Sequence, residues 1–404
     1  MVGPAYAERS RSTALMSIEQ LPPNVWESSG RDCWERVVSR MPSARPFLAT
    51  VWVNAWMQVF GPKLHPVQLH VRDERGAPIG TCLLTARVRR ETVVPHVRVH
   101  LNTDGENAVD SVIVEHNALL AIAGAEDVVA QAVADHIVAM RADEFRVAGV
   151  SEVEVVRLVR AFPGWTADIE WHRAPYVNLD LLRADSRAHL DVLSRNTREQ
   201  LRRSLTRYQR RGPVVVDVAR TASDAEAMFD ELVALHETRW RAAGHAGAFA
   251  SPLRREFHRA FIRDGVPTGH AQLLRITAGS DTIAVLYNLV ANGRVNFYQS
   301  GLRQEDDTHL KPGMVAHHLA IQHYLDHGYA EYDFLSSAPG EGRYKSSLAN
   351  DSRQLAQLTL ARPGWRRRYF DGLRRLRRGA TSVSRSFALH RVPRRAAETP
   401  EPSP

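Results

Sequence analysis

The stretch from Gln299 to Leu348 limits the possible folds of this chain more than any other part of it. A short apolar run at 295–298 has the composition of a buried strand, and Lys311-Pro312-Gly313 precedes an amphipathic run at 314–327 that is typical of a helix. A second short apolar run follows at 331–334. The stretch therefore predicts a strand–helix–strand unit with a glycine in the first turn of its helix.

The start of that helix is suited to binding a phosphate. The first N–H groups of a helix lack partners within it and lie at the positive end of its dipole, and Gly313 lets the backbone approach a ligand closely. Lys311 adds a positive charge. An acyl carrier such as coenzyme A is therefore a candidate ligand. The alternative is that Pro312-Gly313 only turns the chain into the helix.

Six short blocks of the second part of the chain stand out by their order and spacing. They are Leu193-Ser194-Arg195-Asn196-Thr197-Arg198, Leu235-His236-Glu237-Thr238-Arg239-Trp240, Gln299-Ser300-Gly301, Leu310-Lys311-Pro312-Gly313, Tyr332-Asp333-Phe334-Leu335 and Arg343-Tyr344-Lys345. Through these blocks the chain resembles the BioF2-like acetyltransferase family, whose members are tandem GNAT-fold proteins related to the Fem-type peptidyltransferases and to CelD proteins. The likeness spans residues 175–361, and a weaker likeness covers residues 35–170.

The resemblance implies an α/β (α+β) fold of two tandem GNAT-like acyltransferase domains, each a mixed, mostly antiparallel sheet flanked by helices. The residues of the second half predict the same element order, with Ser223 and Glu226 as the capping box of one helix. Turn residues at 163–186 predict a junction between the halves. The expected parts are a flexible leader at 1–30, an N-terminal domain at 31–170, a C-terminal domain at 175–361 and an arginine-rich tail at 362–404.

The resemblance also implies a site. GNAT enzymes hold the pyrophosphate of coenzyme A on backbone amides at the start of the helix after the fourth strand, and an amine attacks the thioester directly. The family's usual second glycine is here Val315 or Ala316. The expected cofactor contacts are Gln299, Ser300, Lys311, Gly313, Met314 and Val315. The expected catalytic residues are Tyr344 as acid, Lys345 as a stabiliser of negative charge, His236 as a proton acceptor, and Asp333 as a base whose pKa burial would raise.

Each of these catalytic residues has a structural alternative. Tyr344 would pack on the sheet beside a solvated Lys345, His236 would be a packed helical histidine, and Asp333 would pair with Arg343. Substrate contacts are expected from Arg195, Arg198, Arg239 and Arg343. For the arginine-rich helix at 196–211, the alternative is a solvated face opposite the apolar stripe of Leu201, Leu205 and Tyr208.

Composition narrows the class of protein. A chain of 404 residues suits two domains plus tails, and 44% hydrophobic with 24% charged residues is typical of a soluble globular protein. The two cysteines, Cys33 and Cys82, suggest neither a disulfide framework nor a zinc site, so we expect a cytoplasmic protein without a metal. The apolar stretch at 118–140 is interrupted by acidic residues and does not predict a membrane span.

The positive charge is concentrated in the tail. Residues 362–404 contain twelve arginines and three acidic residues, so the rest of the chain carries a net charge of −1. Aromatic and apolar residues between the arginines at 365–378 suggest a short interfacial helix on anionic lipid, which predicts peripheral membrane association. Nucleic acid is a less favoured partner, and a disordered tail is the alternative.

These observations together predict an acyl-CoA-dependent N-acyltransferase, using acetyl-CoA or another acyl-CoA, that transfers groups other than aminoacyl. The expected acceptor is a small-molecule amine such as an amino sugar or another cell-envelope or metabolite precursor. One alternative is a Fem-type transferase that uses aminoacyl-tRNA, which the near-neutral body of the chain disfavours. The other is a non-catalytic GNAT-like binding module in envelope polysaccharide assembly.

Overall fold

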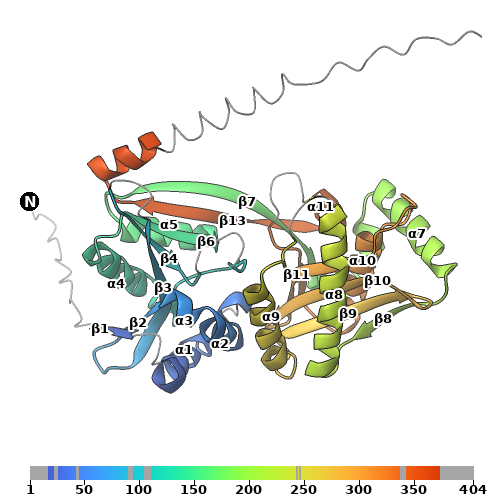
Figure 1. Ribbon diagram of the computed structural model, residues 1–404, viewed down its shortest axis with the longest axis horizontal. Coiled ribbons are helices and arrows are strands. Elements are labelled where there is room, and N and C mark those ends of the chain that lie inside the picture. Colours follow the sequence, from blue (N-terminus) through green and yellow to red (C-terminus); the bar gives the residue numbers. More distant parts are fainter. Residues whose placement is uncertain are drawn as a thin grey trace, which may run out of the picture.

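The computed structural model describes residues 17–21, 26–41, 45–89, 94–103, 111–242, 244, 247–336 and 343–373. One open, mixed sheet runs through the whole molecule (Figure 1). Its strands in order are β1 (Ser17–Leu21), β2 (Val67–Arg72), β3 (Pro78–Arg89), β4 (His96–Leu101), β6 (Glu144–Val150), β13 (Asp351–Ala361), β7 (Thr166–Asn178), β12 (Glu331–Asp333), β11 (Arg294–Leu302), β10 (Asp281–Ala291), β9 (Ala271–Ala278) and β8 (Val214–Val218), with β5 (Leu120–Ala121) beside β3.

The pairing repeats in the two halves of the chain, which we call the first half (residues 31–170) and the second half (residues 175–361). In each half one pair of strands is parallel, β4 with β6 and β11 with β12. The other pairs between described strands are antiparallel. The prediction of mixed, mostly antiparallel sheets is thus confirmed.

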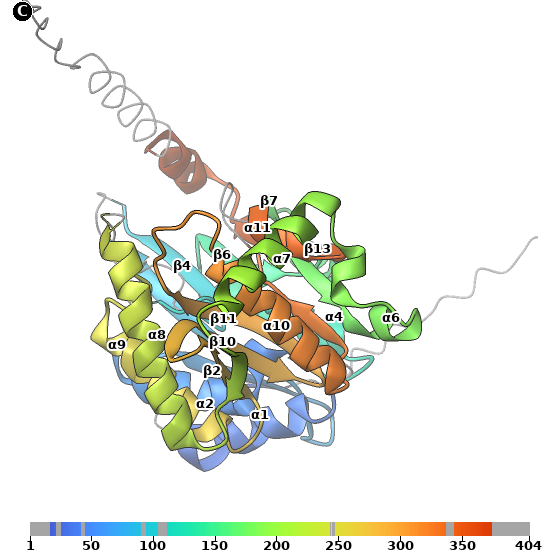
Figure 2. The same cartoon turned by 90° about the vertical axis from the view of Figure 1, so that its right-hand side faces the viewer.

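Helices lie on both faces of the sheet in the second half (Figure 2). Alternate strand residues face opposite layers, because side chains of a strand point to its two faces in turn. Leu273 packs with helices α8 and α9, whereas Leu274 packs with α7 and α10. The helices are α1 (Arg31–Val38), α2 (Thr50–Val59), α3 (Gly61–Leu64), α4 (Glu126–Ala139), α5 (Glu152–Ala161), α6 (Leu179–Ala184), α7 (Arg195–Gln209), α8 (Ala222–Ala242), α9 (Pro252–Gly265), α10 (Pro312–Asp326) and α11 (Arg343–Leu348), with shorter turns at Trp26–Gly30, Pro46–Leu48 and His189–Val192.

Two long strands, β7 and β13, join the halves (Figure 1). β13 pairs with β7 along its length and, on its other side, with β6 of the first half. The end of β7 in turn pairs with β12 of the second half. Each half therefore contributes a strand to the sheet of the other. The predicted junction at 163–186 is a strand and a helix rather than a turn, because β7 and α6 occupy it.

An aromatic core also connects the halves. Trp52 of α2 packs edge-on against Phe257 and Phe261 of α9, with ring centroids 4.8 and 5.0 Å apart. Phe47 and Phe60 belong to the same buried cluster. Since this cluster contains residues from both halves, unfolding of one half would expose apolar surface of the other.

The structure differs from the prediction in the leader and at the start of helix α8. The predicted flexible leader is wrong for 17–21, which pair with β2, and for the turn at 26–30. Helix α8 is capped earlier than predicted. The N–H of Asp224 donates to the hydroxyl of Thr221, and the N–H of Thr221 donates to the carboxylate of Asp224, both at 3.1 Å. The chain offers two overlapping capping boxes here, and the first one is used.

The beginning of the predicted tail is docked on the first half. The N–H of Arg362 donates to the carbonyl of Asp143, and the guanidinium of Arg366 contacts the carboxylate of Asp143 at 2.6 Å. The ring of Phe370 stacks on His96 with centroids 3.8 Å apart. The tail beyond residue 373 lies outside the described residues. Within the part of the chain that is described, no helix combines the length and hydrophobicity needed to cross a membrane.

Candidate active site

Strands β11 and β12 pair over three residues and then part. The parallel ladder joins Arg294–Asn296 to Glu331–Asp333. β11 continues to Leu302, paired on its other side with β10. The described ladder therefore leaves the edge of β11 from Phe297 onward without β12, and an extended ligand placed there would meet the backbone of the strand.

A cavity of about 600 Å³ lies where β11 ends and α10 begins. Arg239, Arg303 and Lys311 line it, and none of its described lining residues carries a carboxylate. The net positive charge favours an anionic ligand such as a phosphate. The other lining residues are Gln200, Ala242, Leu302, Gln304, Leu310, Pro312, Gly313, Met314 and Tyr344.

The first turn of α10 faces this cavity. Lys311 is the N-cap residue, and its N–H is held at 2.8 Å by the hydroxyl of Ser204 on α7. The N–H of Val315 already bonds to the carbonyl of Lys311, so Gly313 and Met314 precede the first bond within the helix. A Cβ on Gly313 would lie 3.2 Å from Leu302 Cδ1, inside this tight space.

Three of the predicted cofactor contacts lie elsewhere. The side chain of Val315 is fully buried in the core and its N–H bonds to the carbonyl of Lys311, so its contact with a cofactor stays a prediction. Gln299 and Ser300 are on β11, where the N–H of Ser300 donates to Gln299 Oε1 at 3.0 Å. Neither of these two residues is among those that line the cavity. Lys311, Gly313 and Met314 do line it.

His236 is held inside the fold by both of its ring nitrogens. Nδ1–H donates to the carbonyl of Ser300 at 3.1 Å, and Nε2 accepts from the N–H of Ala248 at 3.0 Å. Burial lowers the pKa of His236. A neutral histidine with both nitrogens engaged connects α8 to β11, so this geometry favours the structural alternative over proton transfer.

Tyr344 and Lys345 on α11 lie close to the point where β11 and β12 part. Tyr344 lines the cavity, and burial raises its pKa while the positive charge of Arg239 lowers it. Lys345 Nζ donates to the carbonyl of Phe334 at 3.1 Å and lies 5.2 Å from the ring of Phe297. The ammonium of Lys345 thus lies between β11 and the residue that follows β12.

Asp333 is fully buried at the end of β12. Burial alone would raise its pKa, but hydrogen bonding to His116 and the charges of His116 and Arg353 outweigh this, so the pKa is lowered. The predicted rise is therefore wrong. The described partners of Asp333 are His116, with Nε2 3.0 Å from Oδ2, and Arg353, with Nη1 at 3.8 Å. The side chain of Arg343, the predicted partner, lies outside the described part of the chain, so that pairing stays a prediction.

The arginines of α7 mostly face solvent or partners outside the cavity. Arg195 is 92% exposed and pairs with Glu199. Arg198 donates to the carbonyl of Leu193. Neither lines the cavity, to which α7 contributes Gln200. Of the predicted substrate-binding arginines that have described side chains, Arg239 alone reaches the cavity.

The parallel pair of the first half is β4 and β6. Asn117, from the same half, lies between these strands where their pairing ends. The N–H of Asn117 donates to the carbonyl of Gly149 on β6, and its Nδ2 donates to the carbonyl of Leu101 on β4, both at 3.0 Å. The first turn of α4 carries Glu126 and Asp127, whose negative charge opposes phosphate binding. The second half is therefore the better place for an acyl carrier.

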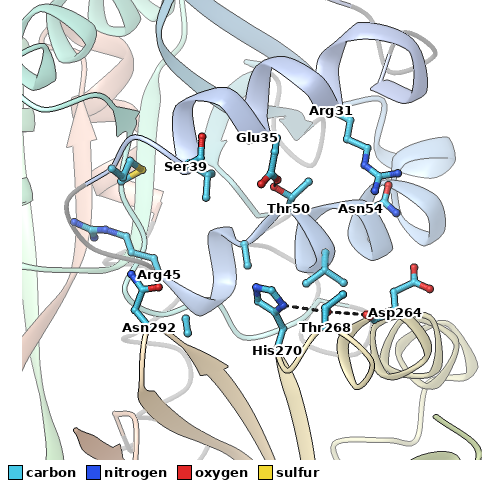
Figure 3. A pocket seen from close by; sticks show the side chains of 15 residues that line it. Arg31, Glu35, Ser39, Arg45, Thr50, Asn54, Asp264, Thr268, His270 and Asn292 are labelled. Carbon is cyan, nitrogen blue, oxygen red and sulfur yellow. Dashed lines mark hydrogen bonds between the residues drawn. The ribbon is translucent and has the colours of Figure 1, made fainter. Parts of the chain in front are cut away.

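Two further cavities lie between the halves. The larger, of about 700 Å³, has side chains of α1 and α2 on one side and His270, Thr268 and Asp264 on the other (Figure 3). The smaller, of about 220 Å³, is lined by His116, Arg294, Asn296 and Arg353 among others. The described residues contain no group of three or more His, Cys, Asp or Glu that could hold a metal ion.

Two histidines near the candidate site, His116 and His317, carry no mark in the sequence. His317 of α10 is fully buried, with Nδ1 2.9 Å from the hydroxyl of Tyr332 and its ring 4.4 Å from that of Phe297. His116 reaches the site from the first half. No local pattern marks either residue, because each is brought to the site by tertiary packing.

Comparison with known proteins supports the fold. A family model described as "Acetyltransferase (GNAT) domain" matches residues 195–346, which contain the cavity and α10. No curated protein matches the chain significantly. Residues 195–346 are thus similar to a GNAT acetyltransferase domain, while the narrower likeness to BioF2-like proteins stays a prediction.

Two solved structures, FemX and L-PGS, share the fold across both halves. FemX superposes with a TM-score of 0.56 at 10% identity, covering 85% of this chain and 96% of FemX. L-PGS from Bacillus licheniformis gives 0.50 at 9% identity, covering 82% and 91%. A tandem GNAT protein from the clavulanic acid biosynthesis pathway gives 0.44 at 13% identity, covering 86% and 100%. At such low identity the likeness concerns the fold alone.

Proposed function

We propose that this protein is an acyl-coenzyme A-dependent N-acyltransferase that acts on an amine acceptor. The observation that carries the proposal is the cationic cavity at the start of α10, beside the edge of β11 that β12 leaves unpaired. It lies within the region matched by the GNAT family model. A phosphate group would find positive charge and two early helix N–H groups there, and no carboxylate among the described lining residues.

The residues present fit such a donor. Coenzyme A would supply an acyl group activated as a thioester. Lys311 and Arg239 would hold its phosphates, with the N–H groups of Gly313 and Met314. Lys345, near Phe297, would stabilise negative charge that develops on the acyl oxygen. The hydroxyl of Tyr344 would protonate the departing thiolate, which is consistent with a pKa raised by burial.

For the acyl group and the acceptor, the proposal names only the chemical class. Acetyl or a longer acyl chain would fit the same phosphate contacts, and the acceptor would be an amino sugar or another envelope or metabolite precursor. A Fem-type transfer from aminoacyl-tRNA is the second candidate, since the fold resembles FemX. Against it, the chain outside the arginine-rich tail is close to neutral, whereas tRNA binding requires a broad positive surface.

Titration calorimetry of the full chain with coenzyme A tests the proposal. We expect binding, and Lys311→Met should weaken it about tenfold or more through loss of a charge-assisted phosphate contact. Lys63→Met is the matched control, because Lys63 is on α3 and does not line the cavity. Absence of coenzyme A binding by the unmodified chain would overturn the proposal, and binding of aminoacyl-tRNA instead would favour the Fem-type alternative.

A further inference from the structure

A segment of the first half, residues 111–118, connects to the second half where β11 and β12 part. Glu115 accepts two hydrogen bonds from Ser336, from the N–H at 2.8 Å and from the hydroxyl at 2.5 Å. His116 bonds to Asp333. Asn117 bonds back to its own half at Gly149. The segment thus brings a histidine from one half to the end of a strand in the other.

The pair of His116 and Asp333 has the geometry of a catalytic dyad. Asp333 is fully buried, and its Oδ1 accepts the N–H of Leu335 at 2.7 Å, which fixes the carboxylate. Its Oδ2 lies 3.0 Å from His116 Nε2. With Nε2–H donating to the carboxylate, the lone pair of the imidazole is on Nδ1. The carboxylate therefore selects the tautomer, as in a Ser-His-Asp site.

The backbone around the pair is held in an uncommon conformation. His116 has a φ of 52° and Leu335, which follows the carboxylate closely, has a φ of 59°. Residues other than glycine adopt this left-handed region rarely, and such residues cluster at functional sites. The backbone is thus held in this conformation at His116 and, two residues after Asp333, at Leu335.

His116 is accessible from a cavity. Its side chain is 16% exposed and lines the cavity of about 220 Å³ between the halves. Arg45 and Ala291 line both this cavity and the larger one of about 700 Å³, so the two adjoin. Asn296, also in the smaller lining, is the last β11 residue paired with β12. An acceptor entering between the halves would therefore arrive beside the unpaired edge of β11.

We propose that His116 is the general base that deprotonates the acceptor amine, with Asp333 as its positioning residue, and that the amine reaches it through the cavities between the halves. This inference rests on the proposed function. As the amine nitrogen bonds to the acyl carbon, the carbon–sulfur bond breaks, the amine proton passes to His116 Nδ1 and the thiolate takes the proton of Tyr344. The products are an amide and a free thiol, and both residues then exchange protons with water.

The base must be neutral to act, so the rate should rise with pH as His116 loses its proton and then level off. The charged groups around it come from several elements. They are Asp333 and Glu331 on β12, Arg353 on β13, Arg294 on β11, Arg45 before the turn at Pro46–Leu48, Glu154 of α5, which pairs with Arg45, and the neighbouring Glu115.

The test measures coenzyme A release from acetyl-CoA by the full chain with a panel of primary amines of graded basicity, across pH. His116→Gln should lower turnover about a hundredfold to ten-thousandfold and remove the low-pH limb. In this variant, weakly basic amines should react better relative to strongly basic ones, because the proton that their nitrogen must lose as it bonds to the acyl carbon is more acidic and needs the base less. Asp333→Asn should lower the rate less and move the limb to lower pH. His172→Gln is the control, since His172 faces Glu170 with 18% exposure and lines neither cavity.

Calorimetry with coenzyme A on the same samples separates this inference from the proposed function. Coenzyme A binding that is equal in His116→Gln and the unmodified chain, with lost turnover in the variant, supports the dyad. Equal turnover and an equal pH profile in the two proteins overturn the dyad alone. A failure of the unmodified chain to bind coenzyme A overturns the proposed function and the role of the dyad with it.

Discussion

Two of the few lysines in the chain lie at the candidate site. Of 53 Lys and Arg residues, only Lys63, Lys311 and Lys345 are lysines. Lys311 lines the cationic cavity, and Lys345 lies between β11 and the end of β12. A lysine presents a compact point charge, whereas an arginine presents a planar fork, so the two are not equivalent at a phosphate or an oxyanion. Nearly all other basic residues of the chain are arginines, so lysine at positions 311 and 345 is consistent with a requirement for a compact point charge at each.

Gly313→Val should abolish coenzyme A binding. Even a Cβ at this position would lie 3.2 Å from Leu302 Cδ1, and the larger side chain would extend into the phosphate approach. Gly61→Val is a matched control, because Gly61 also begins a helix but its Cβ would meet only Met57, at 3.7 Å. Calorimetry gives the affinity and circular dichroism the fold. Unchanged affinity in folded Gly313→Val would rule out the helix start as the phosphate site.

Tyr344→Phe should lower turnover roughly tenfold to a thousandfold and leave coenzyme A affinity nearly unchanged, since only the acidic proton is removed. Burial raises the pKa of Tyr344, so the hydroxyl of the unmodified protein stays protonated at neutral pH. Tyr329→Phe, outside the cavity, is the control. If steady-state kinetics give the same rate for Tyr344→Phe across the pH range, Tyr344 has a packing role.

Sequence patterns pointed to residues whose proposed roles depend on local geometry and missed His116, whose proposed role depends on a contact between distant parts of the chain. Lys311 and Gly313 follow from a helix start, and Tyr344 from its place after a strand. Asp333 was identified, but its pKa direction depends on His116, which is 217 positions away in the sequence. No periodicity or spacing contains such information.

At the level of elements, the hydrophobic periodicity of the sequence predicted the positions of the strand–helix–strand unit in the second half. The apolar run at 331–334 contains strand β12, and the helix expected at 314–327 differs from α10 by one or two residues at its ends. The position of β13 between β6 and β7 could not be predicted, because the sequence of a strand does not specify which strands will pair with it. Because β13 pairs with strands of both halves, the sheets of the two predicted domains are joined into one continuous sheet.

Helix α8 can approach β11 only because residue 301 is glycine. A Cβ there would lie 2.5 Å from the carbonyl oxygen of Leu232, and a backbone atom cannot move aside easily. Gly301→Ala should therefore lower the free energy of unfolding by about 1–3 kcal/mol, the usual cost of overpacking. Denaturant unfolding measures this. Gly372→Ala is the control, since nothing lies within 4 Å of its Cβ, and equal stability of the two variants would contradict the close approach.

For the whole molecule, buried histidines predict sensitivity to acid. Burial lowers the pKa of His258 and His317 to about 3 and that of His70 and His318 to about 4, from 6.5. Above pH 6.5 these groups are neutral in both states and impose no penalty. As the pH falls from 6.5 toward 4, the unfolded chain binds protons that the folded chain does not. Stability then decreases by about 1.4 kcal/mol per pH unit for each histidine.

Denaturant unfolding at several pH values between 7 and 4.5 measures this slope. His70→Gln should reduce this slope by about one histidine's share, because the pKa of His70 is among those lowered by burial. A stability that does not depend on pH in this range would show that the histidines are protonated alike in both states.

The tail is the last whole-molecule feature, and its two parts should behave differently. Residues 362–373 dock on the first half through Arg366 and Phe370, so they belong to the fold. Residues 374–404 carry eight arginines and two glutamates. We propose that this distal part binds anionic membrane, to which each engaged arginine contributes on the order of 1 kcal/mol, screened by salt.

Truncation after Leu373 should therefore leave acyl transfer to a small soluble amine intact and abolish sedimentation with vesicles that contain phosphatidylglycerol. Truncation after Ala361 should in addition lower stability, because Asp143 loses Arg366 and His96 loses Phe370. Vesicles of phosphatidylcholine are the control, and added salt should weaken the sedimentation of the full chain. If the full chain and the Leu373 truncation sediment equally, or neither sediments, the distal tail is not a membrane anchor.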